Sequence, residues 1–150
     1  MKIEKLSKAN LNELTRLVLD LWPACNFSEE YTYFKGTISN EEEVCYLAKD
    51  QNEYMAFIHL TLRKEYVEGA VSSPVGYVEG IYVKPDFRKM GVGRQLLGLA
   101  QKWAKLKGCK EMASDAEIDN LQSIVFHRKN GFRESNRIVC FIMDLPEGEV

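Results

Sequence analysis

Histidine is scarce in this chain of 150 residues, which contains only His59 and His127. Neither histidine has a partner at the spacing of metal ligands, so no metal site is expected. The four cysteines are widely scattered: Cys25, Cys45, Cys109 and Cys140. No Cys-x-x-Cys pair occurs among them, and each is therefore expected to be a small buried apolar residue rather than a ligand.

Basic charge and long apolar runs are also lacking. The formal net charge is −2, which counts against nucleic acid as the main partner. No apolar run approaches the roughly 20 residues of a membrane span. The opening MKIEKLSKANL is not typical of a signal peptide. We therefore expect a cytoplasmic protein with reduced thiols and no membrane partner.

What the sequence does contain is an ordinary globular composition, with 45% hydrophobic and 28% charged residues. The length suits one domain with a sizeable core. No repeat, low-complexity stretch or linker divides the chain, so residues 1–150 are predicted to form a single domain.

Hydrophobic periodicity predicts an α/β (α+β) protein. The predicted strands cover residues 1–6, 44–49, 54–63, 75–83, 112–115, 132–134 and 137–145. The predicted helices begin after a Ser7 cap, at Ser28, after a glycine-containing loop near Gly91, and at Asn120. The last two strands form a closing hairpin. This order predicts a mixed, mostly antiparallel sheet of about seven strands with about four helices on its faces.

The loop before the third helix is the most informative stretch, and it reads Arg88-Lys89-Met90-Gly91-Val92-Gly93-Arg94. Its glycines let backbone approach a ligand closely, and the N-terminus of the following helix is suited to a pyrophosphate. Arg88, Lys89 and Arg94 add positive charge. A triphosphatase loop would need lysine after the second glycine, and a dinucleotide fingerprint would need a third glycine at the position of Leu96.

Two motifs make the family recognisable. Arg88-x-x-Gly91-x-Gly93, after a strand and Pro85, resembles the pyrophosphate-binding motif of the GNAT acetyltransferases. Asn120-x-x-Ser123, followed by Asn130-Gly131-Phe132, resembles the ending of that family. The resemblance implies acetyl-CoA as acetyl donor. It also implies the residues that hold it: Ile81, Tyr82, Val83, Arg88, Lys89, Met90, Gly91, Val92, Gly93, Arg94, Asn120 and Ser123. Asn120 is equally suited to capping a helix.

Five shorter segments resemble the aminoglycoside 6′-N-acetyltransferases within that family: Leu21-Trp22-Pro23, Glu65-Tyr66-Val67-Glu68-Gly69, Ser73-Pro74, Val78-Glu79-Gly80-Ile81 and Ala113-Ser114-Asp115-Ala116. This resemblance implies transfer of acetyl to the 6′-amine of a cationic antibiotic by direct attack in a ternary complex, and a role in resistance. It also implies a homodimer in which residues 137–145 pair between subunits.

The expected catalytic residues are Asp115, Glu79 and Tyr66, and the expected acceptor contacts add Trp22 and Asn136. A polycationic amine needs carboxylates to bind and a base to expose its lone pair. Gly80 is expected to mark a β-bulge beside Glu79.

Each candidate also has a structural interpretation. Glu79 could lie on the surface or pair with a lysine. Asp115 could cap a helix near Ile118, and Tyr66 could be a buried anchor. Trp22 could belong to the core.

His127 departs from the family pattern, because many GNAT enzymes place a tyrosine there as general acid. Tyr66, His127 or no acid at all are the alternatives. Two other functions stay open: the same chemistry on a polyamine, peptide N-terminus or lysine, and a non-catalytic module that binds acyl-CoA.

Overall fold

The computed structural model describes residues 1–148. Its elements follow the order β1 (Lys2–Lys5), α1 (Leu11–Leu21), α2 (Phe27–Thr37), β2 (Glu43–Asp50), β3 (Glu53–Arg63), β4 (Val75–Val83), η1 (Pro85–Phe87), α3 (Val92–Leu106), β5 (Met112–Ser114) and α4 (Leu121–Lys129). The strands form one sheet in the order β1-β2-β3-β4-β5. Only β4 and β5 run parallel. The predicted class, a mixed and mostly antiparallel sheet with four helices, is confirmed.

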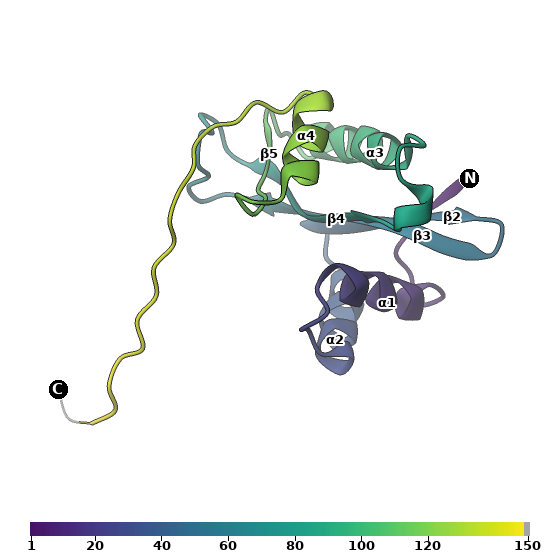
Figure 1. Cartoon of the computed structure of the whole chain (residues 1–150), viewed down its shortest axis with the longest axis horizontal. Coiled ribbons are helices and arrows are strands. Elements are labelled where there is room, and N and C mark those ends of the chain that lie inside the picture. Colours follow the sequence, from purple (N-terminus) through teal and green to yellow (C-terminus); the bar gives the residue numbers. More distant parts are fainter. Residues whose placement is uncertain (149–150) are drawn as a thin grey trace.

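Helices cover both faces of the sheet, with α1 and α2 on one face and α3 and α4 on the other (Figure 1). Successive side chains of a strand point to opposite faces, so one strand serves two cores. On β3, Phe57 packs with Leu14 of α1, whereas Ile58 packs with Leu96 of α3. All four of these side chains are fully buried. The apolar stripes predicted for α1 and α3 therefore face the sheet.

The ends of the helices differ in detail from the prediction. Helix α1 begins at Leu11, several residues beyond the expected Ser7 cap. The reason is local, because the Asn10 side chain accepts from the Ser7 N–H at 2.9 Å and donates to the Lys5 carbonyl at 3.2 Å. These bonds hold the chain in a turn before the helix starts. Gly108, with a φ of +87°, follows α3 as predicted.

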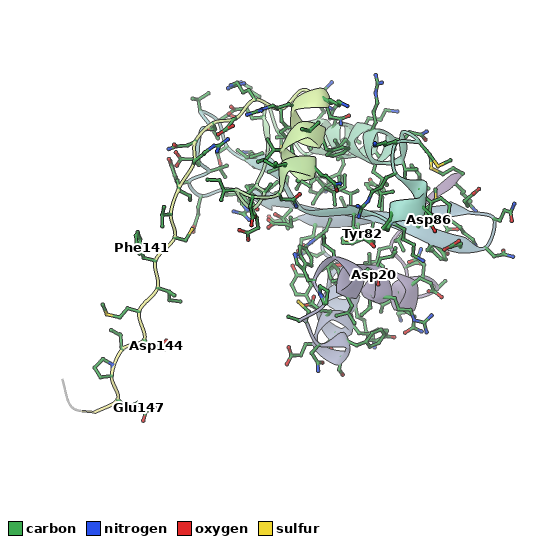
Figure 2. All side chains as sticks on the ribbon, in the orientation of Figure 1. Asp20, Tyr82, Asp86, Phe141, Asp144 and Glu147 are labelled. Atoms are coloured by element: carbon green, nitrogen blue, oxygen red, sulfur yellow. The ribbon has the colours of Figure 1, made fainter. Side chains whose placement is uncertain are left out.

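The predicted closing hairpin is not present in this structure. Residues 130–148 contain no helix or strand, and the sheet has five strands rather than seven. Asn136 still bonds to Glu68, and beyond Arg137 the chain extends away from the body as an arm, on which Phe141, Asp144 and Glu147 are labelled in Figure 2. A strand forms only when its backbone finds a partner. The sequence pattern of a strand is there, but nothing in the described residues pairs with it.

The cysteines are free, as expected, but only Cys45 is buried. Cys25 and Cys109 are half-buried, and Cys140 lies exposed on the arm, so the expectation that all four are buried is wrong. Within residues 1–148 no helix is long and apolar enough to cross a membrane. The same residues hold no cluster of metal-ligating side chains.

Candidate active site

A β-bulge in β4 sets the geometry of the site. His59 pairs with Gly80 and the next residue of β3, Leu60, pairs with Val78, so Glu79 is the extra residue of the bulge. The bulge expected at this position is therefore present. A bulge bends its strand and re-aims the side chains beside it.

Beyond the bulge, β4 and β5 separate. Their parallel pairing ends at Val78 and Ser114, although β4 continues to pair with β3 as far as Val83. One edge of β4 is therefore open from Glu79 onward among the described residues. The region beside this open edge of β4, from Glu79 to Val83, is called the cleft from here on.

Backbone alternation decides which groups face this open edge. The Lys84 N–H donates to the Met55 carbonyl of β3 at 2.8 Å. Backbone groups alternate between the two sides of a strand, so Tyr82 also faces β3, while Ile81 and Val83 face the cleft. Tyr82 instead packs its ring toward α1 (Figure 2). Of the three residues predicted to pair with the donor, two present their backbone groups to the open edge of β4.

Helix α3 opens on unpaired backbone donors. Gly91 precedes the helix with a φ of +80°, and Lys89 has a φ of +63°. The first intrahelical bond runs from the Gln95 N–H to the Gly91 carbonyl at 3.1 Å. The amides of the first turn therefore point outward at the positive end of the helix dipole. Arg88 is anchored beside them, because its Nε donates to the Val83 carbonyl at 2.8 Å.

The second glycine of the motif has a packing role in addition to the one expected. Gly93 is buried, and a Cβ there would lie 2.8 Å from the ring of Phe126 on α4. Its missing side chain allows α3 and α4 to pack closely. Of the two glycines, only Gly91 has a left-handed backbone conformation.

Asn120 and Ser123 begin α4. The Asn120 Oδ1 accepts from the Ser123 N–H at 3.1 Å, so Asn120 caps the helix. Asp115 lies outside this helix, which begins at Leu121, and the interpretation of Asp115 as its cap is wrong.

Glu79 is held by three hydrogen bonds from β3. Arg63 donates from Nε to Oε2 at 3.0 Å and from Nη2 to Oε1 at 2.7 Å, and Thr61 donates to Oε2 at 2.7 Å. Burial raises the pKa of the Glu79 carboxyl, but the bonds from Arg63 and Thr61 outweigh it and hold the pKa below its usual value. Glu79 thus pairs with a cation of its own chain, an arginine rather than the lysine considered from sequence.

Asp115 is held by a tyrosine of the neighbouring strand. The Tyr77 hydroxyl donates to Asp115 Oδ2, and burial together with this bond raises the pKa of Tyr77. The Arg63 guanidinium lies 3.4 Å from the centre of the Tyr77 ring. Tyr77 therefore connects the Arg63–Glu79 pair to Asp115.

Trp22 lies against the bulge. A Cβ on Gly80 would stand 2.7 Å from the edge of the Trp22 ring. The ring is 39% exposed, so it is not a core residue. It forms a wall beside Glu79, and Gly80 supplies the room for it.

Tyr66 and Asn136 both bond to Glu68. The Tyr66 hydroxyl donates to Glu68 Oε2 at 2.6 Å, and Asn136 donates to Glu68 Oε1 at 2.8 Å. Tyr66 is 82% exposed, so it is not a buried anchor. No hydrogen bond among residues 1–148 joins this group to Glu79 or Asp115.

His127 contacts β5 across the cleft. Its Nδ1 lies 2.7 Å from the Ser123 carbonyl, which can only accept, so Nδ1 carries the proton. Nε2 then accepts from the Ser114 hydroxyl at 2.7 Å. In this arrangement neutral His127 has no free proton to give to a leaving group.

Sequence reasoning missed Arg63, Thr61 and Tyr77. A signal existed for Tyr77, because it stands two residues before Glu79 on one strand. Arg63 ends β3 and reads as an ordinary surface charge. Only the pairing of β3 with β4 brings it to Glu79.

Comparisons with known proteins show the family. The family model described as "Acetyltransferase (GNAT) family" matches residues 11–132. The chain belongs to the GNAT family of acetyltransferases. The resemblance found in the sequence motifs is confirmed.

Two curated relatives of this GNAT acetyltransferase bear the same name. The aminoglycoside N(6′)-acetyltransferase type 1 of Stenotrophomonas maltophilia is 39% identical over 145 residues, covering 95% of this chain and 93% of that protein. The protein of the same name from Acinetobacter haemolyticus is 36% identical over 141 residues, covering 94% and 97%.

Two solved structures are also similar to this GNAT chain in fold and in sequence. AAC(6′)-Iy in complex with the bisubstrate analogue CoA-S-monomethyl-acetylneamine aligns with a TM-score of 0.92 at 31% identity, covering 96% of this chain and 98% of that one. The apo aminoglycoside antibiotic 6′-N-acetyltransferase AAC(6′)-IG from Acinetobacter haemolyticus has a TM-score of 0.91 at 34% identity, covering 97% and 100%.

Proposed function

We propose that this chain transfers the acetyl group of acetyl-CoA to the 6′-amine of aminoglycosides by direct attack in a ternary complex. The observation that carries this proposal is the juxtaposition made by the bulge. It places Glu79 beside the open edge of β4, and Tyr77 on the same strand holds the carboxylate of Asp115. An acyl donor on that edge lies next to carboxylates suited to an ammonium.

The chain offers a fitting site for acetyl-CoA. The outward amides of α3, with Arg88 beside them, suit the pyrophosphate. The backbone groups of Ile81 and the N–H of Val83 pair with the pantetheine amides as a further strand would, while the Val83 carbonyl already accepts from Arg88. The Asn120 side chain is already engaged as a helix cap, so we assign Asn120 a weaker part in binding.

In the proposed reaction Asp115 takes the proton of the 6′-ammonium, directly or through water, and Glu79 orients the amine. The amine nitrogen forms a bond to the acetyl carbon, and the carbon–sulfur bond breaks with its electron pair going to the CoA thiolate. The nitrogen then loses its second proton, through water, to that thiolate, which gives the amide and free CoA. The Ile81 N–H, which faces the cleft, stabilises the developing negative charge on the carbonyl oxygen. Trp22 forms a wall of the acceptor pocket.

Acetylation removes a positive charge and a hydrogen-bond donor from the drug, and the proposed physiological role is therefore resistance. The test is release of free thiol from acetyl-CoA with paired aminoglycosides that carry a 6′-amine or a 6′-hydroxyl. We expect release with the 6′-amine compounds alone. Release only with spermidine or a peptide would move the acceptor elsewhere. Release with none of these acceptors, despite acetyl-CoA binding, would favour the non-catalytic interpretation.

We also propose that the protein is a homodimer formed through the C-terminal arm. The arm carries apolar side chains that are highly exposed, from 65% at Ile138 to 98% at Ile142, with Phe141 at 91%. An apolar surface of this kind on a single chain calls for a partner.

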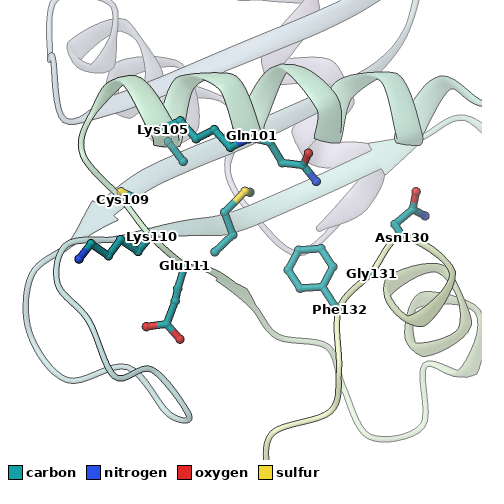
Figure 3. A pocket seen from close by; sticks show the side chains of 10 residues that line it. Gln101, Lys105, Cys109, Lys110, Glu111, Asn130, Gly131 and Phe132 are labelled. Carbon is teal, nitrogen blue, oxygen red and sulfur yellow. The ribbon is translucent and has the colours of Figure 1, made fainter.

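The receiving surface lies at β5. Among the described residues β5 pairs only with β4, so its outer edge is open. A groove of about 480 Å³ lies beside it, lined by α3, β5 and the chain around Gly131 and Phe132 (Figure 3). A strand from a second copy would satisfy the backbone of β5 and bury the side chains of the arm.

A further inference from the structure

Hydrogen bonds within the chain use most of the accepting capacity of Glu79. A carboxylate offers about four lone-pair positions. Oε2 accepts from Thr61 and from the Arg63 Nε, and Oε1 accepts from the Arg63 Nη2. One position remains, on Oε1. Its partners leave Glu79 a single place to receive an ammonium hydrogen.

The same arginine bears on the second carboxylate. Arg63 stacks on Tyr77 with its guanidinium carbon 3.4 Å from the ring centre, and the Tyr77 hydroxyl donates to Asp115 Oδ2. The other oxygen of Asp115, Oδ1, accepts no hydrogen bond from the described residues. Each carboxylate is therefore held by a partner and still has accepting capacity on one of its oxygens.

We propose that Arg63 and Tyr77 are positioning residues that fix Glu79 and Asp115 so that both address the same acceptor amine. This inference rests on the proposed function and deepens it. Arg63 fixes the plane of Glu79 through a bidentate contact, and Tyr77 fixes Asp115 through its hydroxyl. The stacking of Arg63 on Tyr77 links the two carboxylates into one unit, which we call the clamp.

Arginine is suited to this role in a way that lysine is not. Its planar guanidinium donates two parallel bonds and stacks on an aromatic ring at the same time. The pair is partly shielded, with side chains 42% and 25% exposed for Arg63 and Glu79. Arg63 also carries a positive charge into an anionic cleft, which disfavours a second ammonium beside the first. The clamp therefore favours acceptors that present one amine at this position.

The charges around Glu79 set the pH dependence. Arg63 faces Glu79 from β3. On the same strand His59 pairs with Gly80, the residue after Glu79; it is buried, and burial lowers its pKa. Tyr77 approaches on β4 and Tyr33 on α2, and the pKa of each is raised. Arg63 is thus the cation that keeps Glu79 ionised. Without it the pKa of Glu79 rises, so the acidic limb of kcat/KM for the acceptor moves to higher pH.

The experiment compares wild type with Arg63→Gln, Arg63→Lys and the neighbouring control Lys64→Gln, whose salt bridge runs to Glu42. We expect Arg63→Gln to raise the acceptor KM by about tenfold to a hundredfold, as misplacement of a contact does, with KM for acetyl-CoA unchanged. Its acidic limb moves upward in pH. Arg63→Lys is expected to restore the acidic limb of the pH profile but not the acceptor KM. Lysine keeps the positive charge but cannot make the two parallel hydrogen bonds of the guanidinium. Lys64→Gln behaves as wild type.

Tyr77→Phe separates the two halves of the clamp. The ring still supports Arg63, but Asp115 loses its hydrogen bond. We expect kcat to fall, with the acceptor KM little changed. An Arg63→Gln enzyme with wild-type acceptor KM and pH profile would overturn the role of Arg63. A Tyr77→Phe enzyme with wild-type kcat would overturn that of Tyr77.

Failure of the proposed function is a separate outcome. If wild type acetylates no aminoglycoside, the substrate assignment fails, and the clamp is then tested without an acceptor. Carboxyl ¹³C NMR of the free protein measures the pKa of Glu79 in wild type and in Arg63→Gln. A higher pKa in the variant supports the clamp, and an unchanged pKa refutes it.

Discussion

Individual carboxylates in this protein differ in what surrounds them. Glu79 is paired with a cation, the guanidinium of Arg63. Asp115 accepts a hydrogen bond from the neutral hydroxyl of Tyr77 and lies exposed just after β5. A carboxylate that already neutralises an arginine is a weaker proton acceptor than one that does not. The roles of base and of orienting group are assigned on this difference.

Asp115→Asn tests the assignment of the base. Asparagine keeps the shape and can still accept from Tyr77, but it cannot take a proton. We expect turnover to fall by about a hundredfold or more, in the range of general-base catalysis. Acetyl-CoA affinity, measured by calorimetry, stays at the wild-type value because the donor contacts lie on β4 and α3. Wild-type turnover in this variant would remove Asp115 as base.

His59 makes stability depend on pH. It is buried, its Nε2 donates to Glu43 at 3.1 Å, and burial lowers its pKa despite the carboxylate. The unfolded chain therefore binds a proton at His59 before the folded chain does. As pH falls below about 6.5, the free energy of unfolding decreases by at most about 1.4 kcal/mol per pH unit.

Urea denaturation at pH 7.5 and 5.5 measures this effect. His59→Gln keeps a donor for Glu43 and does not titrate. It is expected to lose less stability than wild type over that interval, because the other titrating groups are common to both proteins. Equal losses in the two proteins would show that His59 does not contribute.

At the scale of elements, the N-terminus of α3 depends on one backbone conformation. Gly91 has a φ of +80°, and a Cβ there would meet nothing within 4 Å. Gly91→Val therefore causes no clash. It places a branched residue in the left-handed region at a cost of roughly 1–2 kcal/mol or more, and the loop shifts instead. We expect acetyl-CoA binding to be lost in calorimetry.

Gly98→Ala is the matched control in the same helix, since its Cβ also meets nothing within 4 Å. Alanine there is expected to leave acetyl-CoA affinity unchanged and to stabilise the helix by up to about 1 kcal/mol. Full binding by Gly91→Val would contradict the assignment of the loop to the pyrophosphate.

The elements that sequence predicted well are those with local signals. The stripe of α1 and the apolar run of β3 each follow a period that one segment reveals by itself. The Glu79–Arg63 pair has no such signal, because it depends on the register of β3 with β4. The packing of Gly93 against Phe126 has no local signal either, because Phe126 lies on another helix. Long-range contacts are where prediction from a single sequence stopped.

At the scale of the whole molecule, the main difference from the sequence prediction is the absence of the closing hairpin in residues 1–148. Residues 137–145 have the alternation and apolar content of a strand, yet they extend from the body without a partner (Figure 1). A sequence pattern indicates which segments can form strands. It does not indicate whether the partner strand belongs to the same chain or to a second copy. A dimer reconciles the strand predicted from sequence with the arm present in one chain.

Size-exclusion chromatography with light scattering tests the dimer directly. We expect twice the mass of one chain for wild type and a single-chain mass for Phe141→Asp, because a charge on the arm cannot be buried in the groove beside β5 without a large desolvation cost. Leu106→Asp is the control. It places the same charge on a side chain that is 86% exposed at the end of α3 and does not line the groove, and it is expected to remain dimeric. A single-chain mass for the wild type would contradict the proposed homodimer. A Phe141→Asp protein that stays dimeric would place the interface on another surface.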